Sequence, residues 1–235
     1  VVVLVDEVRR MKLDLLPPSV NKSELRFCSR DGAVIYGLGA VRGVGDGPVE
    51  AIVAARQAAP FKDLADFCKR LDTKKVNKRV LEALINAGAM DDFISDGENL
   101  NQHRARLLAQ MPQAMQGAEQ VARDAAAGMT DLFGGISEPV AEYFASPAHV
   151  APMSAMQRLH GEKDSLGLFL TGHPIDSYES EIRQFCRTPI KDLRTGKQSQ
   201  RVAGMVVSQR VMKTNPIIFR LALACHHRPS VLTSI

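Results

Sequence analysis

The chain is poor in cysteine. Its four cysteines, Cys28, Cys68, Cys186 and Cys225, lie far apart among 235 residues and form no C-x-x-C pair. That is too few for a disulfide-stapled fold, and we expect reduced thiols in a cytoplasmic protein. Hydrophobic residues make up 45% and charged residues 24% of the chain, a balance that excludes collagen-like and wholly disordered classes.

Long apolar runs and targeting signals are missing as well. No run of about eighteen apolar residues occurs, so no transmembrane helix and no membrane partner are predicted. Residues 1–5 are apolar, but Asp6 and Glu7 follow at once, which is not the pattern of a signal peptide. Val1 is not an initiator methionine, and we expect the chain to begin inside a longer protein.

Catalytic motifs are absent too. There is no D-x-D to place carboxylates for two-metal phosphoryl transfer, and no H-E-x-x-H. Asp91 and Asp92 stand at a predicted turn, where adjacent side chains diverge. We expect His160 to be a surface residue and His173 a cap, and Cys225–His227 lacks a fourth metal ligand at sensible spacing. No catalytic, metal or cofactor site is predicted in this chain.

Charge is unevenly distributed. The net charge is +4, yet no acidic residue follows Asp192. That stretch holds seven basic residues, and subtracting them from 30 leaves 23 against 26 acidic ones, a net charge of −3. The asymmetry indicates an anionic partner, nucleic acid first.

Hydrophobic periodicity predicts a mostly α fold. A helix over residues 4–11, with Leu4, Val5, Val8 and Met11 on one face, is stopped by Pro17–Pro18. A glycine-dense stretch opens into another helix with Pro48 at its first position. The remaining helices are predicted over residues 61–71, 76–87 with Gly88 as C-cap, 100–127 with a break or kink near Pro112, 153–170 and 175–187. A loop over residues 128–135 and a linker over 137–152 separate the last two from the rest.

Two regions read as strands. Leu25–Phe27 and Ala33–Tyr36 flank the turn pair Asp31–Gly32, which predicts a small β-hairpin near the N-terminus. A second strand pattern begins at Arg201.

The glycine-dense stretch fits a helix-hairpin-helix pattern, h-x-x-h-x-G-h-G, over Leu38–Gly45. Glycines permit positive φ and close approach of another backbone, and the loop leads into a helix N-terminus, whose N–H groups and positive dipole favour phosphate. We therefore predict sequence-independent DNA contact through Arg42, Gly43, Val44, Gly45 and Gly47. The same pattern also fits a tight turn that joins two core helices without a ligand. A P-loop is excluded because no Gly-Lys-Ser/Thr occurs.

A basic cluster lies at the next helix–helix junction: Lys69, Arg70, Lys74, Lys75, Lys78 and Arg79. Lys74, Lys75, Lys78 and Arg79 are candidates for phosphate neutralisation. A solvated helix face explains the cluster equally well.

Two large apolar residues stand in a glycine-bounded loop. The segment Met129-Thr130-Asp131-Leu132-Phe133 carries Leu132 and Phe133 where no helical periodicity needs them. Exposed apolar anchors are costly unless a partner buries them, so the loop is a candidate docking peptide. Packing of both side chains back onto neighbouring helices is the alternative.

Four blocks in order, Leu15–Glu24, Ile35–Ile52, Asn77–Asp91 and Leu166–Pro174, resemble the alpha subunit of bacterial DNA polymerase III, a C-family replicative polymerase. The resemblance covers about residues 1–214. It implies a DNA-directed DNA polymerase that uses magnesium, of which this chain is a C-terminal-half fragment without the catalytic palm and its aspartates. The implied partners are primer-template duplex, a sliding clamp and other replicase subunits.

The resemblance also implies a layout. Residues 1–36 would end the fingers, and 37–136 would hold the helix-hairpin-helix and the clamp-binding motif at Met129–Phe133. Residues 137–187 would be a linker with helices, and 188–235 the start of an OB-type β barrel. The family's clamp motif begins with glutamine, where this chain has Met129, while its apolar anchors match.

The tail departs from the family. Residues 215–230 contain no acidic residue and no glycine, where the family continues toward an acidic hairpin, so we hypothesise that the tail is out of frame. Two alternatives stay open: a stand-alone helix-hairpin-helix module for DNA binding or repair, and a non-functional product of a broken gene.

Overall fold

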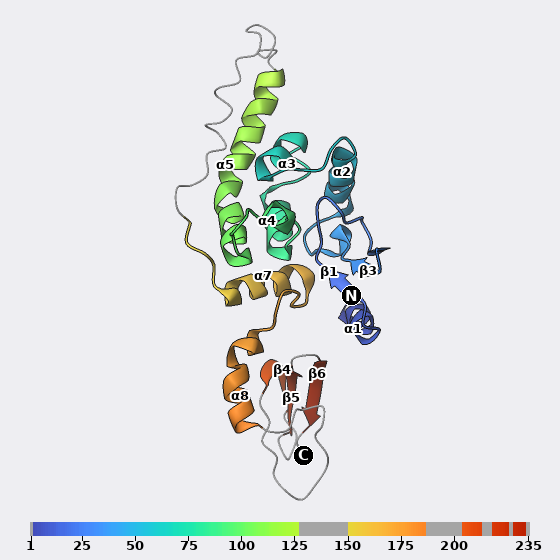
Figure 1. The fold of residues 1–235 in the computed structure, drawn as a ribbon, viewed down its shortest axis with the longest axis vertical. Coiled ribbons are helices and arrows are strands. Elements are labelled where there is room, and N and C mark those ends of the chain that lie inside the picture. Colours follow the sequence, from blue (N-terminus) through green and yellow to red (C-terminus); the bar gives the residue numbers. More distant parts are fainter. Residues whose placement is uncertain (1, 127–149, 187–203, 213–217, 226–227, 234–235) are drawn as a thin grey trace, which may run out of the picture. The chain divides into compact units, whose positions relative to one another are not determined.

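The structure is a computed structural model that describes residues 2–126, 150–186, 204–212, 218–225 and 228–233. The chain divides into two compact units, Val1–Leu170 and Thr171–Ile235. The first unit is mainly helical, which confirms the predicted class (Figure 1).

The N-terminal helix α1 spans Val2–Arg10. It ends well before Pro17, because Lys12 takes a left-handed φ of 59° and the chain turns into strand β1, Asp14–Leu16. The predicted apolar face is only partly buried: Val5 is 2% exposed, whereas Leu4 is 65% and Met11 62% exposed. Because the helix already ends at Arg10, the prediction that Pro17–Pro18 stops it was wrong.

A short β-hairpin follows. Strands β2, Cys28–Arg30, and β3, Ala33–Ile35, are antiparallel and joined by Asp31 and Gly32, which have φ of 53° and 78°. Two positive φ values are typical of a type I′ turn, so the predicted turn is confirmed. The first strand lies three residues later than predicted, because the carbonyls of Glu24 and Leu25 accept hydrogen bonds from Leu38 and Gly39 instead. Strand β1 pairs parallel with β3 to complete the sheet.

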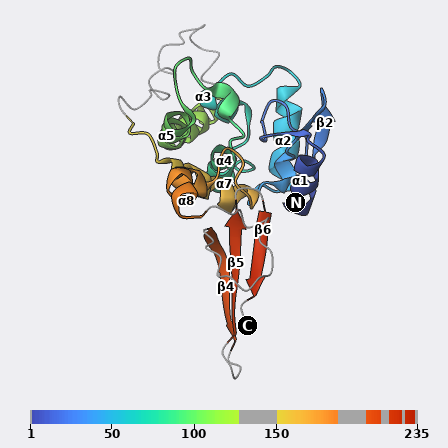
Figure 2. The ribbon, with the colours of Figure 1, turned by 60° about the horizontal axis from the view of Figure 1, so that its bottom comes forward.

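The glycine-dense stretch forms a 3-10 turn η1, Leu38–Ala40, a loop, and helix α2, Asp46–Arg56. The helix begins two residues before the predicted Pro48. Pro48 still lies in the first turn, where a backbone N–H has no partner within the helix. Figure 2 shows α2 alongside β2.

Helices α3, Leu64–Arg70, and α4, Lys78–Ala87, are both capped by side chains. Asp63 accepts from the Asp66 N–H at 2.7 Å, and Asn77 accepts from the Val80 N–H at 3.1 Å. Gly88 ends α4 in a left-handed conformation, as predicted. A 3-10 turn η2, Asp91–Phe93, leads to the next helix.

The long helix α5 spans Leu100–Ala126 and is a single helix through Pro112, so the predicted break is wrong. Pro112 is exposed and thus faces away from the core. Helix α7, Ala155–Leu166, starts with a capping box between Ser154 and Gln157 and ends at the left-handed Gly167, four residues earlier than predicted.

The first unit has one hydrophobic core. Figure 1 shows α3 and α4 beside α5, with α7 near the end of α4. The buried cluster combines residues from all of these elements and from α2, among them Val49, Ile52, Phe67, Leu81, Leu84, Ile85, Leu107 and Leu166. The aromatic rings of Phe61 and Phe67 lie 4.8 Å apart within it.

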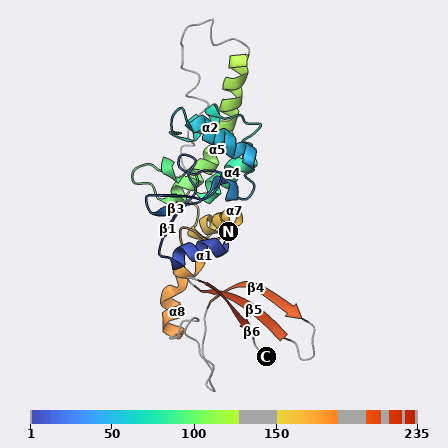
Figure 3. The same ribbon diagram turned by 90° about the vertical axis from the view of Figure 1, so that its right-hand side faces the viewer.

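The second unit contains a 3-10 turn η3, Pro174–Tyr178, helix α8, Glu179–Phe185, and three strands. Strands β4, Met205–Met212, β5, Ile218–Cys225, and β6, Arg228–Thr233, form an antiparallel meander (Figure 3). The predicted strand after Arg201 is confirmed by β4. These strands alone do not make an OB barrel, so that assignment and the frame of the tail stay predictions.

Candidate nucleic-acid interface

The loop between η1 and α2 is shaped by its glycines. Gly43 has a φ of +85°, a conformation that side-chain-bearing residues rarely adopt. Gly45 and Gly47 face open space, since a Cβ added to either would meet no atom within 4 Å. The backbone of Gly45 and Gly47 is therefore open on the side where a side chain would stand.

The loop presents unpaired N–H groups. Among the described residues, no hydrogen bond is made by the N–H of Gly43, Gly45 or Gly47. All three lie at or before the first turn of α2, where the helix dipole is positive. Asp46 also lies in that turn and is exposed, so its carboxylate opposes part of the attraction for an anion.

The N–H groups of Val44 and Arg42, unlike those of the glycines, donate hydrogen bonds within the protein. The Val44 N–H donates to the Val41 carbonyl at 3.1 Å, and its side chain is buried in the core. The Arg42 N–H donates to the Ser165 carbonyl at 2.8 Å. The Arg42 guanidinium lies over Gly167, with Nη2 2.8 Å from where a Cβ would stand, so it faces the C-terminal end of α7. A cation there is favoured by the helix dipole.

The structure brings the basic N-terminus of α4 next to the glycine loop. The Arg79 Nε lies 4.0 Å from the Cβ position of Gly43. Lys74, Lys75, Lys78 and Arg79 are all exposed, and within the described part of the chain none forms an ion pair. The first two sit in a turn closed by Asp72, whose carboxylate accepts from the Lys74 N–H at 2.9 Å.

Arg70 does not belong with these free cations. It donates to the carbonyls of Ala55 and Ala59, pairs with Asp66 at 3.2 Å and lies 4.5 Å over the Phe61 ring. It ties the end of α2 to α3, which corrects its place in the predicted basic cluster.

Helix α7 is joined to the hairpin region at its C-terminal end. Besides the bond from Arg42, the Leu166 carbonyl accepts from the buried Tyr36 hydroxyl at 3.1 Å. Burial raises the pKa of this tyrosine, while Arg42 nearby lowers it. These contacts satisfy carbonyls that a helix end otherwise leaves unpaired.

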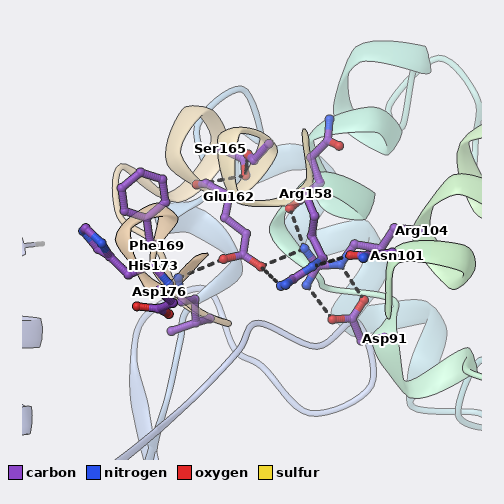
Figure 4. A network of polar contacts seen from close by, with 12 residues as sticks. Asp91, Asn101, Arg104, Arg158, Glu162, Ser165, Phe169, His173 and Asp176 are labelled. Carbon is purple, nitrogen blue, oxygen red and sulfur yellow. Dashed lines mark hydrogen bonds and ion pairs between the residues drawn. The ribbon is translucent and has the colours of Figure 1, made fainter. Parts of the chain in front are cut away.

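A buried ionic network joins η2, α5 and α7 (Figure 4). Arg104 is held by Asp91 through Nε at 2.9 Å and Nη2 at 2.6 Å, and by Glu162 through Nη1 at 2.9 Å. The sequence analysis missed this network. A signal existed: Arg104 precedes Leu107 and Met111 by three and seven residues, so a charge stands on the apolar face of α5.

The predicted divergence of Asp91 and Asp92 is confirmed. Asp92 accepts instead from Ser19 Oγ at 2.6 Å and Lys22 Nζ at 2.9 Å. His173 caps η3 by accepting from the Ile175 N–H at 3.2 Å, and His160 is exposed, as expected.

Some features that the sequence predicts are not covered by the structure. Met129 to Phe133 and the pair His226–His227 fall outside the described residues. Within the described residues, no group of three or more His, Cys, Asp or Glu side chains could hold a metal ion. No described helix is both long and apolar enough to span a membrane.

Comparison with known proteins first gives a match to a motif. Residues 12–105 match the family model of the helix-hairpin-helix motif, which includes the whole glycine loop and α4.

The relatives are more specific. The chain is 51% identical over 223 residues to DNA polymerase III subunit alpha of Pseudomonas fluorescens, 49% to that of Pseudomonas aeruginosa and 42% to that of Escherichia coli. Each match covers 91% of this chain but only 18 to 19% of the relative. The resemblance to the alpha subunit is confirmed, and the chain spans about a fifth of these relatives' length.

Proposed function

We propose that this chain grips the phosphate backbone of duplex DNA, as a segment of a replicative DNA polymerase subunit. The observation that carries the proposal is a set of three exposed glycines at the start of α2, Gly43, Gly45 and Gly47, whose N–H groups make no hydrogen bond among the described residues. Backbone amides read no bases, so the grip is independent of sequence.

The neighbouring cations support the same function. Lys78 and Arg79 begin α4, and Arg79 stands beside Gly43. Their two positive charges oppose the negative charge of the exposed Asp46. In a core turn without a ligand, water alone would solvate these N–H groups and cations.

The test is the salt dependence of duplex binding, measured by fluorescence anisotropy with two duplexes of unrelated sequence. Each phosphate contact contributes about 0.9 to the slope of log affinity against log salt. Replacing Lys78 and Arg79 by alanine should lower the magnitude of the slope by the contribution of about two phosphate contacts. It should weaken the binding of both duplexes equally. Lys62→Ala removes an equally exposed lysine before α3 and should change nothing. A flat salt response of the unchanged chain contradicts the proposal.

We also propose that the segment from Met129 to Phe133 docks onto a sliding clamp. This rests on the resemblance and on the two apolar anchors, Leu132 and Phe133. A clamp threaded on DNA would raise the effective concentration of the polymerase at the primer end. Leu132→Ala with Phe133→Ala should abolish clamp binding and spare duplex binding. Unchanged clamp affinity in that variant refutes the assignment.

Nucleotide addition itself would belong to the rest of the longer protein. The described residues offer no carboxylate cluster for magnesium, so no catalytic step is assigned to them. Similarity to alpha subunits over 91% of the chain supports this view over a stand-alone repair module.

A further inference from the structure

Helix α7 holds an unusual position in the first unit. In sequence it is separated from α5 by residues 127–154. Its buried residues are few: Leu159, Glu162, Ser165 and Leu166. One of the four, Glu162, is charged. A buried charge needs a partner, so the position of that partner constrains how the helix packs.

Glu162 is fully buried, with 0% of its surface exposed, and its partners come from three places. Its Oε1 accepts from Arg104 Nη1 at 2.9 Å, on α5, and lies 3.5 Å from Arg158 Nη1, one turn earlier on α7. Its Oε2 accepts from the Leu170 N–H at 2.9 Å. Arg104 is itself 1% exposed and is fixed on its other side by Asp91 (Figure 4).

Replacing a whole buried ion pair by apolar groups is often neutral, whereas removing one partner alone is strongly destabilising because the other charge stays buried. A shift of α7 by one turn would separate Glu162 from Arg104, which would keep only Asp91, and the loss of one partner of a buried ion pair is strongly unfavourable. Apolar contacts alone would tolerate such a shift far better. The pair therefore selects one rotation and one register of α7 against α5.

That register reaches the glycine loop three residues later. The Ser165 carbonyl accepts the Arg42 N–H at 2.8 Å, and Arg42 directly precedes Gly43. The Ser165 hydroxyl donates to the Gly161 carbonyl at 2.6 Å, within α7. The chain of contacts runs from Asp91 through Arg104 and Glu162 to the loop.

We propose that Glu162 is a positioning residue for the DNA-binding loop: its ion pair with Arg104 sets the register of α7, which in turn anchors Arg42 and the amides that follow. This inference rests on the proposed function. Glu162 would touch no DNA itself.

The variant Glu162→Gln tests this in the whole 235-residue chain. It keeps the side-chain size but removes the charge that pairs with Arg104. Amide exchange of Arg42, followed by NMR, should accelerate about tenfold, because its acceptor is no longer held. The Val20 N–H, which donates to the Ala89 carbonyl at 2.8 Å in the same unit, is the internal reference and should not change.

Duplex affinity supplies the second readout. Loss of an acidic group raises the net charge by one, which by simple electrostatics strengthens DNA binding. A positioning role has the opposite effect, and affinity should fall severalfold. Glu119→Gln makes the same charge change at an exposed site on α5 and should bind as well as the unchanged chain or better.

Equal acceleration at Arg42 and Val20 would mean that Glu162 acts on global stability alone, and would overturn the proposal. So would unchanged exchange at Arg42, or faster exchange with undiminished affinity. If the unchanged chain binds no duplex, the proposed function fails, while the exchange measurement still decides whether Glu162 holds the loop. Should Glu162→Gln not unfold cooperatively, Glu162→Asp, which keeps the charge but shortens its reach, is judged by the same criteria.

Discussion

Gly43 has a positive φ, and an added Cβ would clash with no neighbouring atom. Glycine is therefore favoured here by the backbone conformation and not by a lack of space. The nearest atom to an added Cβ is the Arg79 Nε at 4.0 Å, an ordinary contact. The loop thus needs a residue that tolerates positive φ at position 43. Gly45, by contrast, has a φ of −84°, which any residue can adopt.

We expect Gly43→Ala to lower the free energy of unfolding by about 1 kcal/mol, since alanine resists positive φ. Gly45→Ala should change it by only a few tenths of a kcal/mol, roughly the size of a neutral surface substitution. Urea denaturation of both variants measures the difference. Equal stability of the two would show that the left-handed loop is not the solution conformation.

Glu98 provides a pH-dependent contribution. Bidentate hydrogen bonds from Arg106, at 2.8 and 2.9 Å, lower the pKa of this carboxyl to about 2, with further help from His103 and the Ser95 N–H. Its side chain is 9% exposed, so solvent screens the interaction little. A carboxyl with a lowered folded-state pKa stabilises the fold above its ordinary pKa of 4.5 and loses that effect as the pH falls toward 2.

Glu98→Gln should therefore cost on the order of 2 kcal/mol at neutral pH and progressively less between about pH 4.5 and 2. Unfolding free energies of the two proteins, measured in urea across this interval, should converge at the acid end. Parallel curves would mean that the ion pair with Arg106 does not form. Glu119→Gln, at an exposed position, serves as the matched control.

At the scale of elements, helix α4 combines core packing with the display of two cations. Its N-cap Asn77 accepts from the Val80 N–H at 3.1 Å and precedes Lys78 and Arg79 directly. Asn77→Ala should lower the unfolding free energy by about 1 kcal/mol, and Asn77→Ser should restore most of it. Thermal unfolding by circular dichroism checks both. A neutral alanine variant would indicate a frayed first turn.

The elements that could be predicted are those with local signals. Helix α4 follows from apolar periodicity and from Gly88, and the β-hairpin turn from Asp31–Gly32. Their boundaries were less accurate, because long-range bonds decide them: the carbonyls of Glu24 and Leu25 bind Leu38 and Gly39 instead of a strand. Local patterns contain no record of such partners.

The candidate site divides in the same way. The glycine loop and the cations of α4 were predicted because each is contiguous in sequence. Their proximity, and the buried pair of Arg104 and Glu162, join residues far apart in the chain. A charged residue is assigned to the solvent face by default, so a buried ion pair is found only when its place on an apolar face is noticed.

At the scale of the whole molecule, the hydrophobic cluster of the described residues lies within the first unit. The buried cluster extends from Val5 to Leu168, inside the unit that ends at Leu170. A chain of residues 1–170 should therefore unfold cooperatively, with the midpoint that the helical unit shows in the full chain. A broad, non-cooperative transition would favour the alternative of an incompletely folded gene product.

The same truncation decides where DNA binding resides. Residues 171–235 hold ten of the 30 basic and four of the 26 acidic residues, so removing them leaves 20 against 22, a net charge of −2. The overall electrostatic interaction of this negatively charged chain with DNA is then repulsive. Any binding must therefore come from a local positive site. We expect residues 1–170 to retain duplex binding with a salt slope close to that of the full chain, and to lose it with Lys78→Ala and Arg79→Ala. Loss of binding in a cooperatively folded 1–170 would instead assign the DNA contact to residues 171–235, because the glycine loop and α4 are both still present in the shortened chain.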